Sequence, residues 1–151
     1  GRFGVSICYD LWFPEVTRTL TAMGAEVIIN PVLASFIDRP ADLAIAQGSA
    51  AMFQSYVFHI NGLLAGGNGY SMVIDPAGQI LHRGSVQEEI IPIEVDFDLV
   101  RRQRREGILR MGQPHKSFRD NKVAFPVYGP DFDRSYLDAL GPLVKPGRPA
   151  R

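Results

Sequence analysis

Apolar residues alternate with small or polar ones at the start of the chain. The apolar members Phe3, Val5 and Ile7 predict a short buried strand. Pro14 then begins a helical pattern that stops at Gly24, since proline is favoured in the first helical turn and glycine just after the last. The apolar positions at helical spacing are Val16, Leu20 and Met23.

A second strand follows the helix, because residues 27–29 are all apolar and Asn30-Pro31 closes the run. Strand, helix and strand in close succession predict neighbouring strands in an α/β layer. Further on, the pattern predicts strands over 56–60, 70–74, 79–81 and 90–95, with a β-turn over 75–78. It also predicts three helices: one over 41–54, one capped by Asp96 or Asp98 that ends near 106, and a short one within 133–140. Pro92 restricts the strand over 90–95 to an edge or a bulge.

Composition and charge narrow the class of protein. Of 151 residues, 46% are hydrophobic and 21% charged, as in globular domains. Sixteen basic residues balance sixteen acidic ones, so we expect no general attraction to nucleic acid or to an anionic membrane. No stretch reaches the ~20 apolar residues that span a bilayer. The single cysteine excludes an internal disulfide framework and favours a reducing compartment, so we expect a cytoplasmic protein.

That cysteine, Cys8, lies between the first predicted strand and the helix that begins at Pro14. A strand–turn–helix step exposes a side chain at a sheet edge, where nearby helix amides favour the thiolate, the nucleophilic form. A lone cysteine in an apolar run can also be a small core residue. Taken alone, Cys8 favours this second interpretation.

The residues around Cys8 reverse that preference. A long, ordered pattern comprises residues 4–15 (GVSICYDLWFPE), Arg18 and residues 24–31 (GAEVIINP). It resembles the nucleophile segment of the nitrilase superfamily, the carbon–nitrogen hydrolases. The likeness continues to residue 106 through Asn61-Gly62, residues 69–71, 74–78 and 94–98, Val100 and Arg104. Where the family usually carries Arg-Ala-x-Glu-Asn, this chain has SAAMF at residues 49–53, which leaves the branch of the family open.

The resemblance implies an α/β fold, part of a four-layer α-β-β-α sandwich. Residues 1–106 are then the C-terminal half of a carbon–nitrogen hydrolase domain, and residues 107–151 an irregular extension that packs on the domain or a partner subunit. By the same match Cys8 is the nucleophile of a Cys-Glu-Lys triad, and the backbone N–H of Tyr9 supplies part of an oxyanion hole. The family's Glu and Lys precede the cysteine, but none of the seven residues before Cys8 is Glu or Lys. We therefore expect both in an N-terminal half of the same protein, and no activity from residues 1–151 alone.

The expected substrate is a small amide or carbamoyl compound, hydrolysed through a cysteine thioester with release of ammonia or an amine. Nitriles are a weaker alternative. Pocket candidates follow the carboxyl ends of the first two strands, where open α/β sheets place ligands: Tyr9, Trp12, Phe13, Val32 and Leu33. Trp12 and Phe13 can equally pack the helix onto the sheet. We expect neither a cofactor nor a metal, and a homo-oligomer of at least two subunits.

Other functions stay open beside this one. A catalytically silent scaffold could keep the same fold and pair into dimers. The arginines of residues 101–105 suggest a nucleic-acid surface, but pairing with Asp98 makes a solvated face or a subunit contact the better interpretation. A Cys–His dyad would need His59, expected to be structural, or His82 or His115, both expected at the surface.

Overall fold

The computed structural model describes residues 1–36, 38–64, 66–122 and 124–144. They fall into two compact units, Gly1–Asp120 and Asn121–Arg151. Among its described residues the second unit holds a 3₁₀ turn, η2 (Pro126–Tyr128), and the helix α5 (Ser135–Asp138), which confirms the short helix predicted within residues 133–140. The first unit carries the sheet and all features discussed below.

A five-stranded sheet organises the first unit. Its strands, in spatial order, are β1 (Phe3–Val5), β2 (Val27–Val32), β3 (Tyr56–Asn61), β6 (Met72–Ile74) and β7 (Ile80–Arg83). The first three run parallel, and β6 and β7 are antiparallel to their neighbours. The predicted turn between β6 and β7 is confirmed, with Gly78 in the left-handed region and its N–H donating to the Asp75 carbonyl at 3.0 Å. A small hairpin, β4 (Leu63–Leu64) and β5 (Gly67–Asn68), projects beyond β3.

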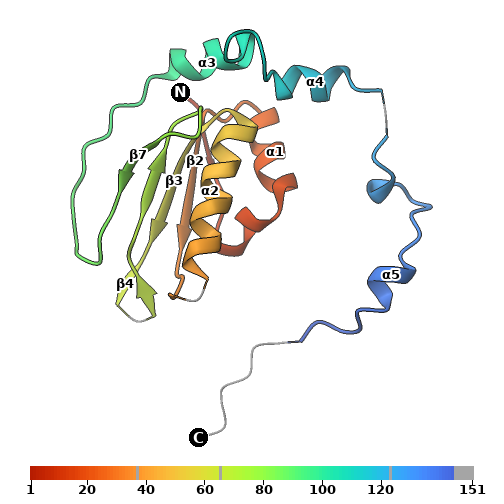
Figure 1. Cartoon of the computed structure of the whole chain (residues 1–151), viewed down its shortest axis with the longest axis horizontal. Helices are drawn as coiled ribbons and strands as arrows, with labels where there is room; N and C mark the ends of the chain where they lie inside the picture. The colour runs from red at the N-terminus through yellow and green to blue at the C-terminus, as the bar shows by residue number, and fades with distance from the viewer. Residues whose placement is uncertain (37, 65, 123, 145–151) are drawn as a thin grey trace, which may run out of the picture. The chain divides into compact units, whose positions relative to one another are not determined.

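Two helices cover one face of the sheet, α1 (Pro14–Ala22) and α2 (Arg39–Phe53) (Figure 1). The core beneath them is built from Leu11, Ala25, Ile28, Ala46, Ala50, Val57, Met72 and Ile74. The predicted inner face of α1 is partly wrong, because Met23 is 72% exposed while Thr17 and Thr21 are buried. Thr21 is accommodated there since its hydroxyl donates to the Thr17 carbonyl at 2.8 Å.

The opposite face of the sheet carries exposed apolar side chains. Phe3 and Val5 of β1 are 60% and 58% exposed, and Ile60 of β3 is 41% exposed. The predicted alternation is therefore present, but its buried positions are Gly4 of β1 and Ser6 just after it, on the side of α1 and α2. Glycine and serine leave room for close packing beneath α1 and α2, whereas the bulky apolar residues point to the other side, where Val27 and Tyr56 pack with Val100.

An extended segment follows β7 and leads to α3 (Phe97–Glu106). The predicted strand over 90–95 is wrong, since the described residues there pair with no strand; Pro92 has no N–H to donate to a ladder. The side chains of this segment still alternate in burial: Ile91, Ile93 and Val95 are half-buried, whereas Ile90 is almost fully exposed. The segment therefore lies along the sheet without joining it.

The cap of α3 is as predicted. The Asp96 carboxylate accepts hydrogen bonds from the N–H groups of Asp98 and Leu99 at 2.9 and 3.0 Å. Arg101 pairs with Asp98 at 3.0 Å and with Glu26 at 2.7 Å, which ties α3 to the start of β2. After α3 comes α4 (Pro114–Asp120), a helix the sequence pattern did not predict.

Substitution of Asp96 tests this cap. Asp96→Ala removes the acceptor for two N–H groups, so we expect the free energy of unfolding to fall by about 1 kcal/mol. Asp96→Asn keeps a capping oxygen and serves as the matched control, with a loss of only a few tenths of a kcal/mol. Urea denaturation of the full-length protein measures both, and equal losses in the two variants would contradict the assignment of the cap.

Candidate active site

Cys8 lies in a tight turn between β1 and α1. It begins the 3₁₀ turn η1 (Cys8–Trp12), and its φ of 53° places it in the left-handed region. A residue with a side chain rarely adopts this conformation, and such strain concentrates at functional sites. The thiol is exposed, which contradicts the alternative that Cys8 is a small core residue. The turn thus presents the sulfur at the carboxyl end of β1.

Two neighbouring side chains hold this turn. The Asp10 carboxylate accepts a hydrogen bond from the Ile7 N–H at 2.9 Å. The Asn30 amide, from β2, donates to the carbonyl oxygens of Ser6 and Cys8 at 3.0 and 3.4 Å. Both sides of the turn are therefore fixed by polar groups that the sequence pattern did not place at the site.

A cavity of about 360 Å³ opens beside the thiol. Its lining residues are Cys8, Tyr9, Trp12, Val32, Leu33, Ala34, Asp38 and Asp42. The structure thus brings five of the six predicted site residues together. The exception is Phe13, which does not line this cavity and packs edge-on against Tyr9 with ring centroids 5.2 Å apart. Phe13 is 47% exposed, so its contact with Tyr9 supports neither a place in this cavity nor packing of the helix onto the sheet.

Two carboxylates in this cavity were missed from the sequence. Asp38 and Asp42 belong to the start of α2, which the predicted helix boundaries placed slightly too late. The buried Asp42 accepts a hydrogen bond from the Trp12 indole N–H at 2.7 Å, and its second oxygen lies 4.0 Å from the Arg39 guanidinium. Asp42 therefore fixes the orientation of Trp12 on the cavity wall.

His59 is buried in β3, directly beside Asn30 in the parallel register. Its Nδ1 lies 2.7 Å from the Asn30 amide oxygen, and its Nε2 lies 2.6 Å from the Arg39 guanidinium. Burial, together with the positive charge of Arg39, lowers the pKa of His59 to about 3. The imidazole is therefore neutral at physiological pH, and its surroundings are those of the structural histidine expected at this position.

The other two histidines are half-buried rather than exposed as predicted. His82 lies 3.4 Å from the Glu89 carboxylate, and the His115 Nε2 lies 2.8 Å from the Phe53 carbonyl. Neither lines the cavity at Cys8, so nothing in the described residues supports a Cys–His dyad. The described residues also contain no group of three His, Cys, Asp or Glu side chains placed to hold a metal ion.

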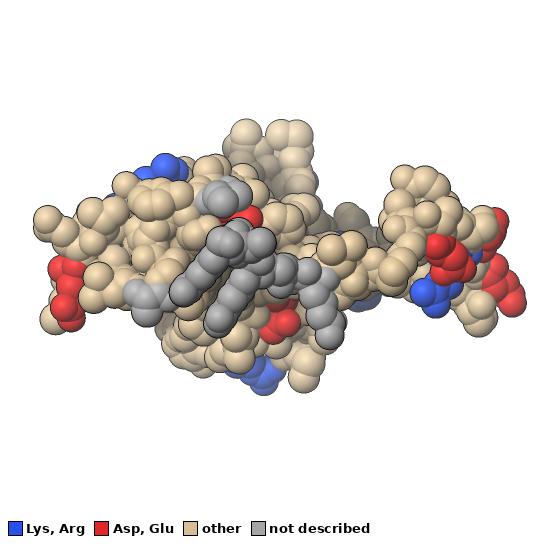
Figure 2. Space-filling view, turned by 90° about the horizontal axis from the view of Figure 1, so that it is seen from below, with Lys and Arg blue, Asp and Glu red and all other residues tan. Residues whose placement is uncertain are grey.

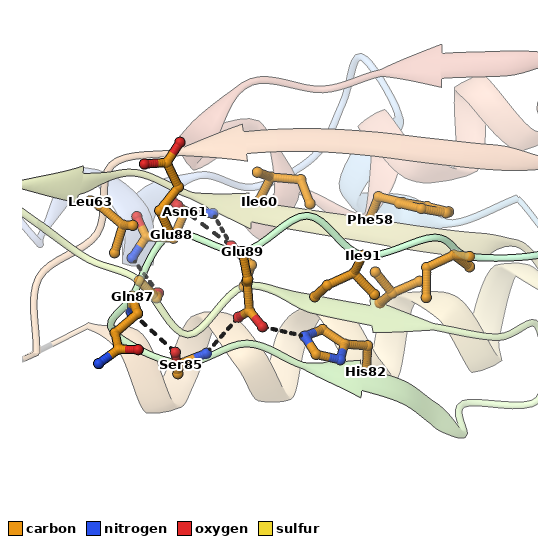
Figure 3. Close-up of a pocket in the computed structure, with 14 residues that line it drawn as sticks. Phe58, Ile60, Asn61, Leu63, His82, Ser85, Gln87, Glu88, Glu89 and Ile91 are labelled. Carbon is orange, nitrogen blue, oxygen red and sulfur yellow. Dashed lines mark hydrogen bonds and ion pairs between the residues drawn. The ribbon is translucent and has the colours of Figure 1, made fainter.

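A second cavity, of about 300 Å³, lies between the sheet and the segment that follows β7. Figure 3 shows Ile91 near Phe58 across this space, and Glu89 pointing toward His82 and Ser85. Glu89 accepts a hydrogen bond from the Ser85 N–H at 2.8 Å, so its carboxylate holds the loop in place. The lining contains no cysteine, and its apolar part, such as Phe58, belongs to the face of the sheet opposite α1 and α2.

The arginine-rich helix α3 does not present a uniform basic face. Arg104 turns inward and donates to the carbonyl oxygens of Ala25 and Gln54 at 2.6 and 3.0 Å, while Arg101 pairs with acidic residues. Figure 2, seen from the side away from α3 in Figure 1, shows Lys and Arg side chains scattered singly among other residues there. These contacts favour structural roles for Arg101 and Arg104.

No helix of the described residues has both the length and the apolar character needed to cross a bilayer.

Comparison with known proteins places this geometry in a family. The model of the carbon–nitrogen hydrolase family matches residues 1–105. The chain therefore belongs to the carbon–nitrogen hydrolases, and its mixed α/β fold corresponds to part of the α-β-β-α sandwich of the nitrilase superfamily.

Individual relatives agree with this assignment. An (R)-stereoselective amidase from Pseudomonas sp. is 33% identical over 114 residues, which cover 70% of this chain and 40% of that enzyme. The structure of Nit3 from Saccharomyces cerevisiae, a member of branch 10 of the nitrilase superfamily, is 31% identical, with a TM-score of 0.64 over 68% of this chain and 40% of that one. A variant of the amidase from Nesterenkonia sp. AN1, with fluoroacetamide's acetamide moiety added covalently at the active-site cysteine, is 25% identical, with a TM-score of 0.53 over 56% of this chain and 34% of that one. This chain thus spans less than half the length of each.

The lowered pKa of His59 predicts a pH-dependent stability. The native state keeps the imidazole neutral down to about pH 3, whereas the unfolded chain protonates it near pH 6.5. Between these values the unfolded state binds more protons, so stability falls as the pH falls, by up to about 1.4 kcal/mol per pH unit.

The measurement compares the wild type with His59→Gln, which cannot titrate. Between about pH 7 and about pH 5, we expect urea denaturation to show a loss for the wild type that exceeds the loss for the variant by about 1–2 kcal/mol. Equal losses would show that His59 does not remain neutral in the native state.

Proposed function

We propose that the protein containing this chain is an amidase that hydrolyses small amide or carbamoyl substrates, with Cys8 as the nucleophile. The observation that carries the proposal is the exposed thiol of Cys8, held in a strained turn at the mouth of a cavity. Membership of the carbon–nitrogen hydrolase family supports it. So does the Nesterenkonia amidase, in which a covalent adduct forms at the active-site cysteine.

The proposed reaction has two halves. The Cys8 thiolate attacks the amide carbon, and the backbone N–H of Tyr9 donates a hydrogen bond to the oxygen that becomes negative. The tetrahedral intermediate collapses, the C–N bond breaks, and the nitrogen leaves as ammonia or an amine after taking up a proton. Water then attacks the thioester, which releases the carboxylic acid and restores Cys8.

The proton transfers need groups that the cavity does not supply. Its two carboxylates belong to Asp38 and Asp42, and the latter is already engaged by Trp12 and Arg39. We propose that a Glu and a Lys come from an N-terminal half of the same protein and that residues 1–151 alone are inactive. The exposed apolar face of the sheet, which includes Phe3, supports such a covering half, because large exposed apolar patches mark interaction surfaces.

We further propose a homo-oligomeric enzyme in the cytoplasm. A reducing compartment fits the lone, exposed cysteine, which has no partner for a disulfide within the sequence.

The scaffold alternative is less well supported, because a scaffold gives no reason to expose a thiol in a strained turn beside a cavity. Nitriles stay the weaker alternative among substrates, since relatives of this chain are named amidases.

Removal of the thiol tests the proposed nucleophile. In the full-length protein, Cys8→Ala should lower ammonia release from a small amide by at least about 1,000-fold, because alanine has no thiol to form the proposed thioester. Thr19→Ala, an exposed substitution on α1 outside the cavity, is the control and should keep wild-type turnover. Turnover retained in Cys8→Ala would overturn the proposal.

Chemical labelling separates the enzyme from the scaffold. Iodoacetamide should alkylate Cys8 in the folded full-length protein, and a small amide held as the thioester or bound in the cavity should slow this reaction. Mass spectrometry of the peptide that contains Cys8 measures the rate. A thiol that reacts at the same rate with and without every amide tested would favour the scaffold.

A further inference from the structure

Four buried polar side chains form a continuous chain from α2 to the Cys8 turn. They are Arg39, His59, Asn30 and Ser6, and none is more than 3% exposed. They come from four different elements or connections, so only the folded sheet brings them together. We call this set the Arg39–Ser6 relay. Burial of so many polar groups is costly unless each finds a partner, so their arrangement calls for a physical explanation.

The direction of each hydrogen bond in the relay follows from the chemistry of Arg39. A guanidinium has only donors, so the His59 Nε2 accepts from it at 2.6 Å. The neutral imidazole then carries its hydrogen on Nδ1, which donates to the Asn30 amide oxygen at 2.7 Å. This contact orients the Asn30 amide with its NH₂ group toward the Cys8 turn.

At the turn, the Asn30 NH₂ group meets acceptors on both sides of Ile7. It lies 3.0 Å from the Ser6 carbonyl, 3.1 Å from the Ser6 hydroxyl and 3.4 Å from the Cys8 carbonyl. The left-handed conformation of Cys8 persists only if its surroundings hold it. Asn30 is placed to do so, and rotation of its amide would turn an oxygen toward these carbonyls.

The same guanidinium also reaches the cavity wall. Arg39 lies 4.0 Å from Asp42, which accepts the hydrogen bond of the Trp12 indole. One buried arginine therefore connects the turn that carries the thiol with the aromatic wall that faces it. Neither His59 nor Asn30 lines the cavity, so neither can touch a substrate there.

We propose that His59 and Asn30 are positioning residues, which orient the Cys8 turn for attack through the hydrogen bonds of the Arg39–Ser6 relay. This inference rests on the proposed function, since it gives the turn its catalytic meaning. A purely structural network would affect the melting temperature alone. A positioning role affects the rate at which Cys8 reacts, under conditions where the protein is fully folded.

The decisive variant is His59→Leu, which keeps much of the volume but can neither accept from Arg39 nor donate to Asn30. In the full-length protein, we expect kcat to fall by about 10- to 100-fold with KM changed less than about 3-fold, because misplacement of a nucleophile slows the chemical step. The rate of Cys8 alkylation by iodoacetamide should fall at least about 5-fold.

The matched control is His59→Gln, whose amide can accept from Arg39 and donate to Asn30. It should return both rates to within about 3-fold of the wild type. A folded His59→Leu protein with wild-type kcat and alkylation rate would overturn the proposal. So would a His59→Gln protein that is folded and as slow as His59→Leu.

If His59→Leu does not fold, Asn30→Asp decides in its place. Aspartate keeps the acceptor for His59 but removes the donor to Ser6 and Cys8, so the same losses in kcat and alkylation are expected, and their absence overturns the proposal. Alkylation also separates this inference from the proposed function. If Cys8→Ala keeps its turnover while His59→Leu slows alkylation, the nucleophile is wrong but the relay does orient the turn.

Discussion

The contact between the Asn30 amide and the Cys8 turn is the interaction on which the rest of the site depends. Asn30 is in β2, between β1, which leads into the turn, and β3, which carries His59. Because the three strands are parallel, their carboxyl ends meet at one edge of the sheet, and residues distant in sequence become neighbours there. A buried amide in the middle strand can therefore reach the turn on one side and the imidazole on the other.

The two faces of the sheet differ in how closely other parts of the chain pack against them, and both border this edge. On the helical side, small residues such as Gly4 and Ala25 let α1 approach the sheet closely; a side chain at Gly4 would lie 3.1 Å from the Ala25 Cβ. On the other side Phe3, Val5 and Ile60 are left exposed. The cavity at Cys8 lies at this edge, and the proposed N-terminal half would change how far water reaches it. Exclusion of water would strengthen each hydrogen bond to a developing oxyanion.

Much of this arrangement could be predicted from the sequence, and the failures have physical reasons. The order of strands and helices follows from local apolar patterns and from turn residues such as Pro14 and Gly78, which act within a few positions. The turn that carries Cys8 could be predicted because the residues that indicate it are contiguous in the sequence. The buried positions of α1 were misjudged because Thr17 and Thr21 satisfy their hydroxyls locally, a possibility that hydrophobic spacing ignores. The strand expected near Pro92 failed because alternation alone cannot show whether a partner strand is available.

The polar relay escaped prediction for a different reason. Arg39, His59 and Asn30 are separated by 20 and 29 positions, and each looks ordinary in its own segment. Their pairing arises only from the parallel register that puts Asn30 beside His59. Among the described residues the Arg39 Nε is also buried without a hydrogen-bond partner, so the relay is not arranged for greatest stability. Apolar residues of similar volume would cost less to bury, and buried polar groups that break this rule are expected where a structure serves function. The cost is understandable if the relay holds one conformation of the Cys8 turn, since apolar side chains cannot specify the direction in which a carbonyl or an amide points.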